Sequence, residues 1–294
     1  MRGDAVSTAS DIYSFGVALW EILTRRQAYA HHQTYREHRA NVLAHQRPQI
    51  PADCPTSLAA LLARCWAPDA KMRPSAASLV SELNSMIVEL AIPFEDGYQF
   101  WSSQLQQVSC EWALFIKKLY PHLGLPLPDP EVRDLAGLSN AGHDSASYVV
   151  DDDDEAVSIA SLRALVTGAN KLTVSAFLFG RLVGCLGPLD AGFIERVRLL
   201  MSKQWFHGEL STRMAADLLS AKGLERCFLL RFSNLRPCFV MSRLESGCVY
   251  HYLIARLPLG RYKLGEEVFA DFASFLASLE VCIGDWWLAR HSRE

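Results

Sequence analysis

The sequence predicts an α+β protein in three parts: an N-terminal helical part, a helical connector, and a C-terminal antiparallel sheet flanked by two helices. Residues 10–23 are apolar nearly all round a helix, which is typical of a helix buried inside a larger fold. Residues 228–233 alternate with the period of a strand. Between them, residues 121–156 concentrate proline, glycine, serine and acidic residues, as linkers do.

The composition indicates a folded protein of a reducing compartment. Half of the 294 residues are hydrophobic, and the net charge of −3 gives no general attraction for nucleic acid or an anionic membrane. The eight cysteines form no C-x-x-C pair, and no signal-peptide pattern opens the chain. The most apolar stretch, 174–186, is too short to span a membrane and contains Arg181. We therefore expect a cytoplasmic location, no membrane span and no nucleic-acid partner.

The N-terminal part contains three expected helices, at 10–23, 57–66 and 75–90. Two of its segments resemble the end of a protein-kinase catalytic domain, in the style of tyrosine kinases and tyrosine-kinase-like kinases. SDIYSFGVALWEILT is similar to the central C-lobe helix, and LLARCWAPDAKMRPS to the penultimate helix with its CW…RP signature. The resemblance implies a truncated C-lobe over residues 1–92, with three residues in structural roles: Asp11, Gly16 and Arg73.

Two of these residues match kinase positions whose partners are missing from the chain. Asp11 matches the aspartate that holds the catalytic loop, and Arg73 matches the arginine that pairs with the A-P-E glutamate. The sequence contains no Gly-rich loop, V-A-I-K lysine, H-R-D, D-F-G or A-P-E motif. Phosphoryl transfer depends on these groups, so the chain as printed is not expected to be a competent kinase. ATP and Mg²⁺ would be needed only by a full-length kinase.

The connector is expected over residues 93–203. Apolar side chains recur at helical spacing over 98–120, with a break near Ser109, and again at 158–166, 174–186 and 191–202. The acidic run at 151–155 lacks the alternate spacing of calcium ligands, so a solvated loop is expected and no metal site is assigned.

Arg231 is the most informative residue of the C-terminal part. It lies within FLLRFS, where a buried charge is costly without a partner, and shares one strand face with Leu229 and Ser233. A guanidinium beside a hydroxyl on one face suits a phosphate ligand. The alternative is an arginine at a strand edge whose head group lies in water.

Segments around this strand resemble a Src-homology-2 (SH2) domain. The matching segments are WFHG, LL…G, FLLRFS, FVMS and VYHYLI, in the order of that family. The resemblance implies an SH2 domain over residues 204–294. It also implies that Arg231 binds two phosphate oxygens of phosphotyrosine, with Ser233 and His251 in support. Asn234 and Arg236 would belong to the phosphate-binding loop.

The pocket departs from the family at two positions that often carry basic residues. The first-helix position is Thr212, with Arg213 beside it as a candidate contact, and the position two after the strand histidine is Leu253. Contacts between cations and the phosphotyrosine ring are worth about 0.5–2 kcal/mol each. Their loss should lower the affinity while the pairing of Arg231 with phosphate dominates.

The order of kinase remnant, connector and C-terminal SH2 domain resembles the SH2-containing, tyrosine-kinase-like kinases of amoebae. The connector is similar to the EF-hand-like region before the SH2 domain of Cbl and STAT proteins. We therefore expect a phosphotyrosine-dependent signalling module that binds tyrosine-phosphorylated proteins or peptides. The alternatives are a functional kinase, if Met1 is internal to a longer reading frame, and a scaffold or dominant-negative fragment.

Overall fold

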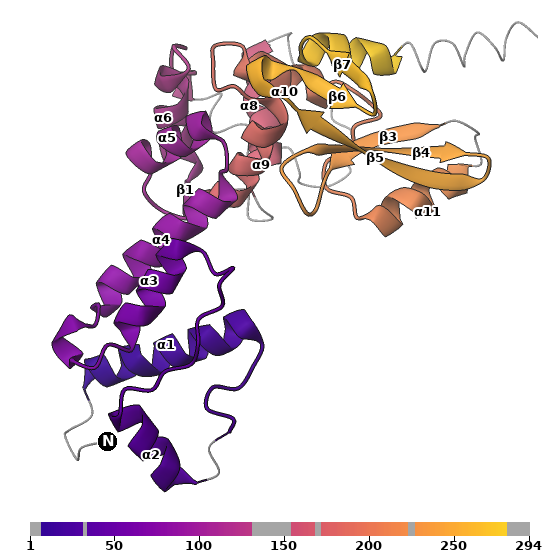
Figure 1. Cartoon of the computed structure of the whole chain (residues 1–294). Coiled ribbons are helices and arrows are strands. Elements are labelled where there is room, and N and C mark those ends of the chain that lie inside the picture. The colour runs from indigo at the N-terminus through magenta and orange to yellow at the C-terminus, as the bar shows by residue number, and fades with distance from the viewer. Residues whose placement is uncertain (1–6, 32–33, 131–153, 168–171, 223–226, 281–294) are drawn as a thin grey trace, which may run out of the picture. The chain divides into compact units, whose positions relative to one another are not determined.

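The computed structural model describes residues 7–31, 34–130, 154–167, 172–222 and 227–280 (Figure 1). Most of the acidic run lies outside these residues. The chain divides into two compact units, Met1–Ile87 and Val88–Glu294. The expected domain boundaries at 92/93 and 203/204 remain predictions, and each unit is described by itself.

The first unit is helical, as the sequence predicts. Its helices α1 and α3 cross closely at Gly16, where a Cβ atom would lie 2.7 Å from the Cβ of Cys65. Apolar side chains from the helices form two small clusters, one around Ile12 and Leu61 and one around Trp20. The elements are α1 (Thr8–Thr24), α2 (Tyr35–Leu43), α3 (Thr56–Cys65), the 3-10 turn η1 (Ala70–Met72) and α4 (Ala76–Ala91).

The connector pairs two helix–strand–helix segments. Their short strands β1 and β2 form an antiparallel ribbon in which Cys110 lies opposite Val174, and the EF-hand-like character of the connector stays a prediction. The first loop, 105–111, offers a single carboxylate, Glu111. The described elements are α5 (Glu95–Gln104), β1 (Ser109–Glu111), α6 (Trp112–His122), α8 (Asp154–Val166), β2 (Thr173–Ser175), α9 (Ala176–Leu186) and α10 (Phe193–Met201).

The sequence places the start of α9 two residues too early. A helix was expected from residue 174, but Thr173–Ser175 pairs as strand β2. The helix begins at Ala176, where the Ser175 hydroxyl accepts the Leu178 N–H at 3.2 Å as an N-cap.

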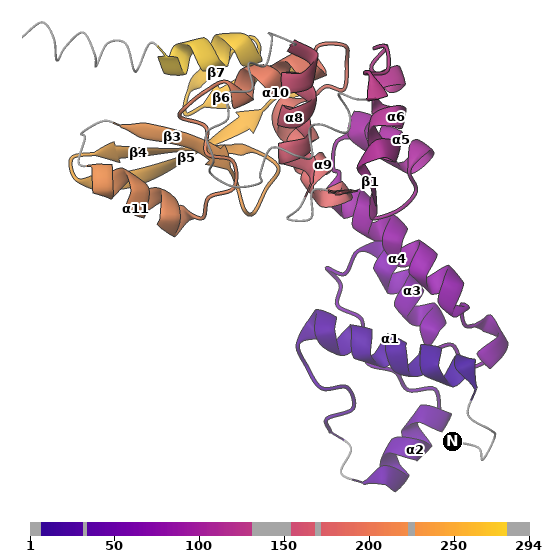
Figure 2. The ribbon, with the colours of Figure 1, turned by 180° about the vertical axis from the view of Figure 1, so that it is seen from behind.

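The C-terminal part is an antiparallel sheet in the order β3-β4-β5-β6-β7. Helix α11 packs on one face of the sheet (Figures 1 and 2), and residues 272–280 form a helix whose apolar residues pack on the other. The strands and the two flanking helices agree with the predicted fold class. The elements are α11 (Thr212–Lys222), β3 (Phe228–Phe232), β4 (Phe239–Glu245), β5 (Cys248–Arg256), the turn η2 (Pro258–Gly260), β6 (Tyr262–Leu264) and β7 (Glu267–Phe269).

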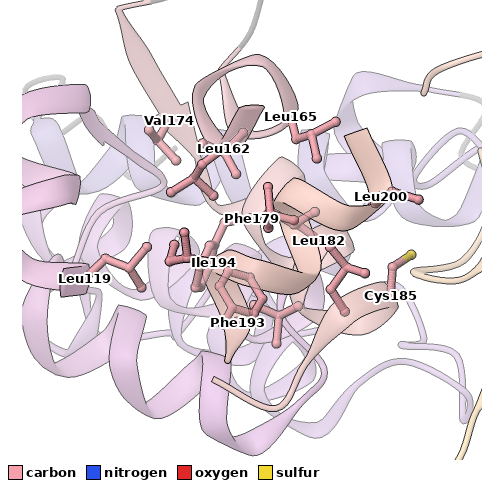
Figure 3. Packing of buried hydrophobic residues seen from close by; sticks show 14 of the residues in the cluster. Leu119, Leu162, Leu165, Val174, Phe179, Leu182, Cys185, Phe193, Ile194 and Leu200 are labelled. Atoms are coloured by element: carbon pink, nitrogen blue, oxygen red, sulfur yellow. The ribbon is translucent and has the colours of Figure 1, made fainter. Parts of the chain in front are cut away.

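One hydrophobic core joins the connector to the sheet. Buried residues from Val88 to Leu279 form a single cluster, which includes Phe179 and Leu182 of α9 as well as Phe232 of β3. Figure 3 shows the part of this core around α9, with Phe179 and Leu182 among the side chains of the neighbouring helices. The packing is therefore continuous between the connector and the sheet.

Candidate functional site

Arg231 lies on β3, an edge strand of the five-stranded sheet, and is almost completely buried, with 3% of its surface exposed. Its guanidinium donates four hydrogen bonds. Nε donates to Ser242 Oγ at 3.2 Å, and Nη2 donates to Thr212 Oγ1 at 3.2 Å. Nη1 donates to the carbonyls of Leu210 at 3.3 Å and Phe232 at 3.2 Å. Although β3 is an edge strand, the head group of Arg231 is buried, so the alternative in which it lies in water is wrong.

Every one of these acceptors is neutral. Among the described residues no carboxylate forms an ion pair with Arg231, and burial lowers the pKa of its guanidinium. The four bonds are longer than the usual ~2.9–3.0 Å of an N–H···O hydrogen bond. Phosphate oxygens form shorter and stronger charge-assisted bonds. The site is therefore electrostatically suited to an anion that can replace neutral acceptors.

The surroundings of Arg231, called the pocket from here on, are formed where α11 meets the sheet. Ser211 caps α11 by accepting the Met214 N–H at 3.1 Å, which places the exposed Thr212 directly over Arg231. On the other side of the pocket, His251 Nδ1 lies 2.9 Å from Ser242 Oγ. Thr212 and His251 are both exposed, so solvent reaches the two side chains that contact Arg231 and its partner Ser242.

The strand register brings the predicted histidine to the arginine. Ser242 of β4 lies opposite His251 of β5, and Val240 lies opposite both Arg231 and Leu253. Burial lowers the pKa of His251 from its ordinary value of 6.5, and the positive charge of Arg231 lowers it further. The free pocket therefore holds one permanent cation and a histidine that favours its neutral form.

Ser233 organises the loop that follows β3. Its hydroxyl accepts the backbone N–H groups of Leu235 at 3.2 Å and Arg236 at 3.3 Å. Asn234 and Arg236 are exposed on this loop. The Ser233 backbone N–H donates to the Cys238 carbonyl at 2.9 Å, which closes the loop. The loop thus presents exposed donors beside the strand that carries Arg231.

Arg213 is not brought to Arg231. Its side chain is 94% exposed and lies 4.0 Å from Asp217 Oδ2 on the same helix. Leu253 is half exposed and occupies the same sheet face as Arg231. The pocket wall on this side is therefore apolar rather than basic.

Two polar side chains of the site were not predicted from the sequence. Ser242 is fully buried and contacts both Arg231 and His251. It shares a strand face with Val240 and Leu244. A hydroxyl on this apolar strand face could have indicated that Ser242 has a polar partner in the site. Thr212 was treated only as the loss of a basic residue, but it accepts a hydrogen bond from Arg231.

The three predicted kinase-lobe residues have different surroundings. Asp11 is exposed on α1, and Gly16 is buried at the crossing with α3. Arg73 is half-buried and donates to the carbonyls of Ala67 at 3.0 Å and Ala9 at 2.8 Å. Its guanidinium also lies 5.1 Å from the centre of the Tyr13 ring. Arg73 thus joins the start of α1 to the loop before α4.

Comparisons with known families agree with both parts of this description. Residues 205–277 match the SH2 domain family, and residues 1–83 match the protein tyrosine and serine/threonine kinase family. The chain therefore contains the end of a protein kinase domain followed by a C-terminal SH2 domain, the class of domain that binds phosphotyrosine. The resemblances of the N-terminal part to a kinase C-lobe and of the C-terminal part to an SH2 domain are confirmed.

The homologues of this chain are SH2-containing dual specificity kinases of Dictyostelium discoideum. Dual specificity protein kinase shkC is 32% identical over 84% of this chain and 48% of its own length. Dual specificity protein kinase shkA is 28% identical over 98% of this chain and 57% of its own length. The chain spans about half the length of these relatives. Among solved structures, the SH2 domain of a Monosiga brevicollis CRK/CRKL homolog (crka1) is 27% identical over 26% of this chain and 72% of its own, with a TM-score of 0.24.

Neither a membrane-spanning helix nor a metal-binding cluster is present among the described residues. None of the described helices is both long enough and apolar enough to cross a bilayer. No group of three or more histidine, cysteine or acidic side chains in the same residues is placed to bind a metal.

Proposed function

We propose that this chain binds tyrosine-phosphorylated proteins through Arg231, which forms a two-oxygen contact with the phosphate. The observation that carries the proposal is a buried guanidinium whose acceptors among the described residues are all neutral. A buried cation without a counter-charge costs several kcal/mol, and a phosphate dianion removes that cost. Ser233 and His251 support the same oxygens, and exposed donors of Asn234 and Arg236 contribute from the loop.

The test is binding of tyrosine-phosphorylated peptides to the full chain and to Arg231→Lys. Lysine keeps the charge but loses the two-pronged donor geometry. We expect a loss of at least ~2 kcal/mol, or about thirtyfold in Kd. Arg243→Lys is the matched control, because Arg243 lies on the opposite sheet face and pairs with Glu245 at 3.1 Å. Equal binding by wild type and Arg231→Lys would refute the assignment of the pocket.

We further propose that this phosphotyrosine-binding part works beside a protein kinase domain that uses ATP and Mg²⁺. Residues 1–83 and the names of the relatives support the proposal. In-frame translation of the genomic DNA upstream of Met1 tests it. H-R-D, D-F-G and A-P-E motifs there would support a kinase, whereas an in-frame stop directly upstream would contradict it.

The proposed compartment is the cytoplasm. Six cysteines of the described residues, at positions 54, 65, 110, 185, 238 and 248, carry free thiols, as is usual where thiols are kept reduced. Imaging of a tagged full chain in cells, with a secreted-protein marker as the comparison, tests this proposal.

A further inference from the structure

Arg181 is a buried cation in an otherwise apolar helix of the connector. Only 7% of its surface is exposed, and its neighbours in α9 from Phe179 to Leu186 are also buried. An apolar residue of similar volume, such as methionine, would fill this position without the desolvation cost of a charge. The Nε atom of Arg181 is also buried, and it donates to no described residue. The free energy of unfolding alone therefore does not favour an arginine here.

The guanidinium of Arg181 reaches the part of the chain that forms the phosphotyrosine pocket. Its Cζ atom lies 4.4 Å from the centre of the Phe232 ring, a cation–π distance. Its Nη2 atom lies 2.5 Å from Glu209 Oε1. Phe232 ends β3 directly after Arg231, and Glu209 directly precedes Leu210. One connector side chain thus contacts both segments that surround the pocket arginine.

These two segments supply the carbonyls that hold Arg231. Arg231 Nη1 donates to Phe232 O at 3.2 Å and to Leu210 O at 3.3 Å. The separation of these carbonyls sets the direction of the guanidinium, because Nη1 must reach both. Arg181 contacts Phe232 itself and the residue next to Leu210.

The same face of α9 also contacts the loop after β3. At Gly184, three residues beyond Arg181, a Cβ atom would lie 2.5 Å from the Cβ of Pro237. Pro237 follows Arg236, whose backbone N–H is accepted by Ser233. The connector therefore touches the strand and the loop of the pocket from one helix face.

We propose that Arg181 is a positioning residue for phosphotyrosine binding. By contacting Phe232 and Glu209, it fixes the two carbonyls that orient Arg231. The helical connector therefore contributes to the geometry of the binding pocket, besides separating the kinase-like part from the SH2 domain. This inference rests on the proposed function, in which Arg231 binds the phosphate.

The experiment uses the full chain with its arginines labelled with ¹⁵N. The ligand added as the probe is O-phospho-L-tyrosine. NMR follows the Nε–H resonance of Arg231, which is identified by its loss in Arg231→Lys. Arg181→Met keeps the buried volume and removes the charge, and Arg181→Lys restores the charge without the planar group. The matched control is Arg198→Met, because Arg198 pairs with Glu195 on the surface of α10.

We expect Arg181→Met to weaken O-phospho-L-tyrosine binding about tenfold, with Arg181→Lys in between and Arg198→Met unchanged. The Nε–H resonance of Arg231 should also move in the free Arg181→Met protein, which a loss of stability alone would not cause. If Arg181→Met is folded and both its affinity and this resonance equal those of wild type, the inference is overturned.

A second variant keeps the inference testable if Arg181→Met does not fold. Glu209 is 63% exposed, so Glu209→Gln removes the counter-charge of Arg181 without disturbing the core. It should move the Arg231 resonance and weaken binding about threefold, and no change in either would overturn the inference. Failure of the proposed function is distinguishable, because wild type itself would then bind no O-phospho-L-tyrosine.

Discussion

Tyr262 provides a test of whether the connector and the sheet unfold together. Its hydroxyl on β6 donates to the Cys185 carbonyl on α9 at 2.7 Å, and the bond is buried. Burial raises the pKa of Tyr262, so the hydroxyl keeps its proton and acts as a donor. Cys185 lies in the last turn of α9, and the next helical donor, the N–H of Leu189, bonds to Asp96 Oδ2 at 2.8 Å instead. Tyr262 is therefore the partner that satisfies this carbonyl.

Tyr262→Phe removes the donor and leaves the Cys185 carbonyl buried and unpaired. The expected loss in the free energy of unfolding is about 1–3 kcal/mol. For a unit of this size, each kcal/mol lowers Tm by about 2–4 °C. The ring still packs against Phe275, with centroids 5.3 Å apart, so no cavity term adds to the loss.

Hydrogen–deuterium exchange of the full chain measures this effect segment by segment. Peptides from α9 and from β4 should lose protection by the same free energy, because one core joins them. Tyr250→Phe is the control, since Tyr250 is half exposed on β5, and it should change stability by less than ~0.5 kcal/mol. A loss of protection confined to β4, with α9 unchanged, would refute a shared unfolding unit.

Two further predictions concern the pocket and its contact with α9. Burial and the charge of Arg231 lower the pKa of His251 in the folded state. As the pH falls below the ordinary pKa of 6.5, the unfolded chain binds the proton first, so the folded state loses stability. Wild type should therefore lose more stability than His251→Asn in urea unfolding between about pH 7 and pH 5.5, and equal losses would contradict this assignment. Gly184→Ala should lower the free energy of unfolding by about 1–3 kcal/mol, because its Cβ would lie 2.5 Å from the Cβ of Pro237. The control is Phe177→Ala on the exposed side of α9, and equal stability of the two variants would count against the close packing.

Predictions from the sequence were correct where a pattern of neighbouring residues alone carried them, and failed where a feature was too short to show a pattern. The period of two around Arg231 placed Leu229, Arg231 and Ser233 on one strand face without any tertiary information. Helices α1, α3 and α4 of the kinase-like part followed from apolar side chains at helical positions, whereas α2, which has no buried residue, was not predicted. By contrast, β2 was read as the start of α9, because a three-residue strand has too few residues to show a period.

The sequence by itself determined which residue is the best candidate for phosphate binding, because a charge in an apolar strand is costly wherever the strand packs. Only the tertiary structure decided what surrounds it. Strand register brought Ser242 and His251 together, and the start of α11 placed Thr212 on Arg231. The same structure brings Arg181 of the connector to Phe232 and Glu209, contacts that the sequence separation of these segments conceals. Such contacts depend on how distant elements pack, and no local periodicity records them.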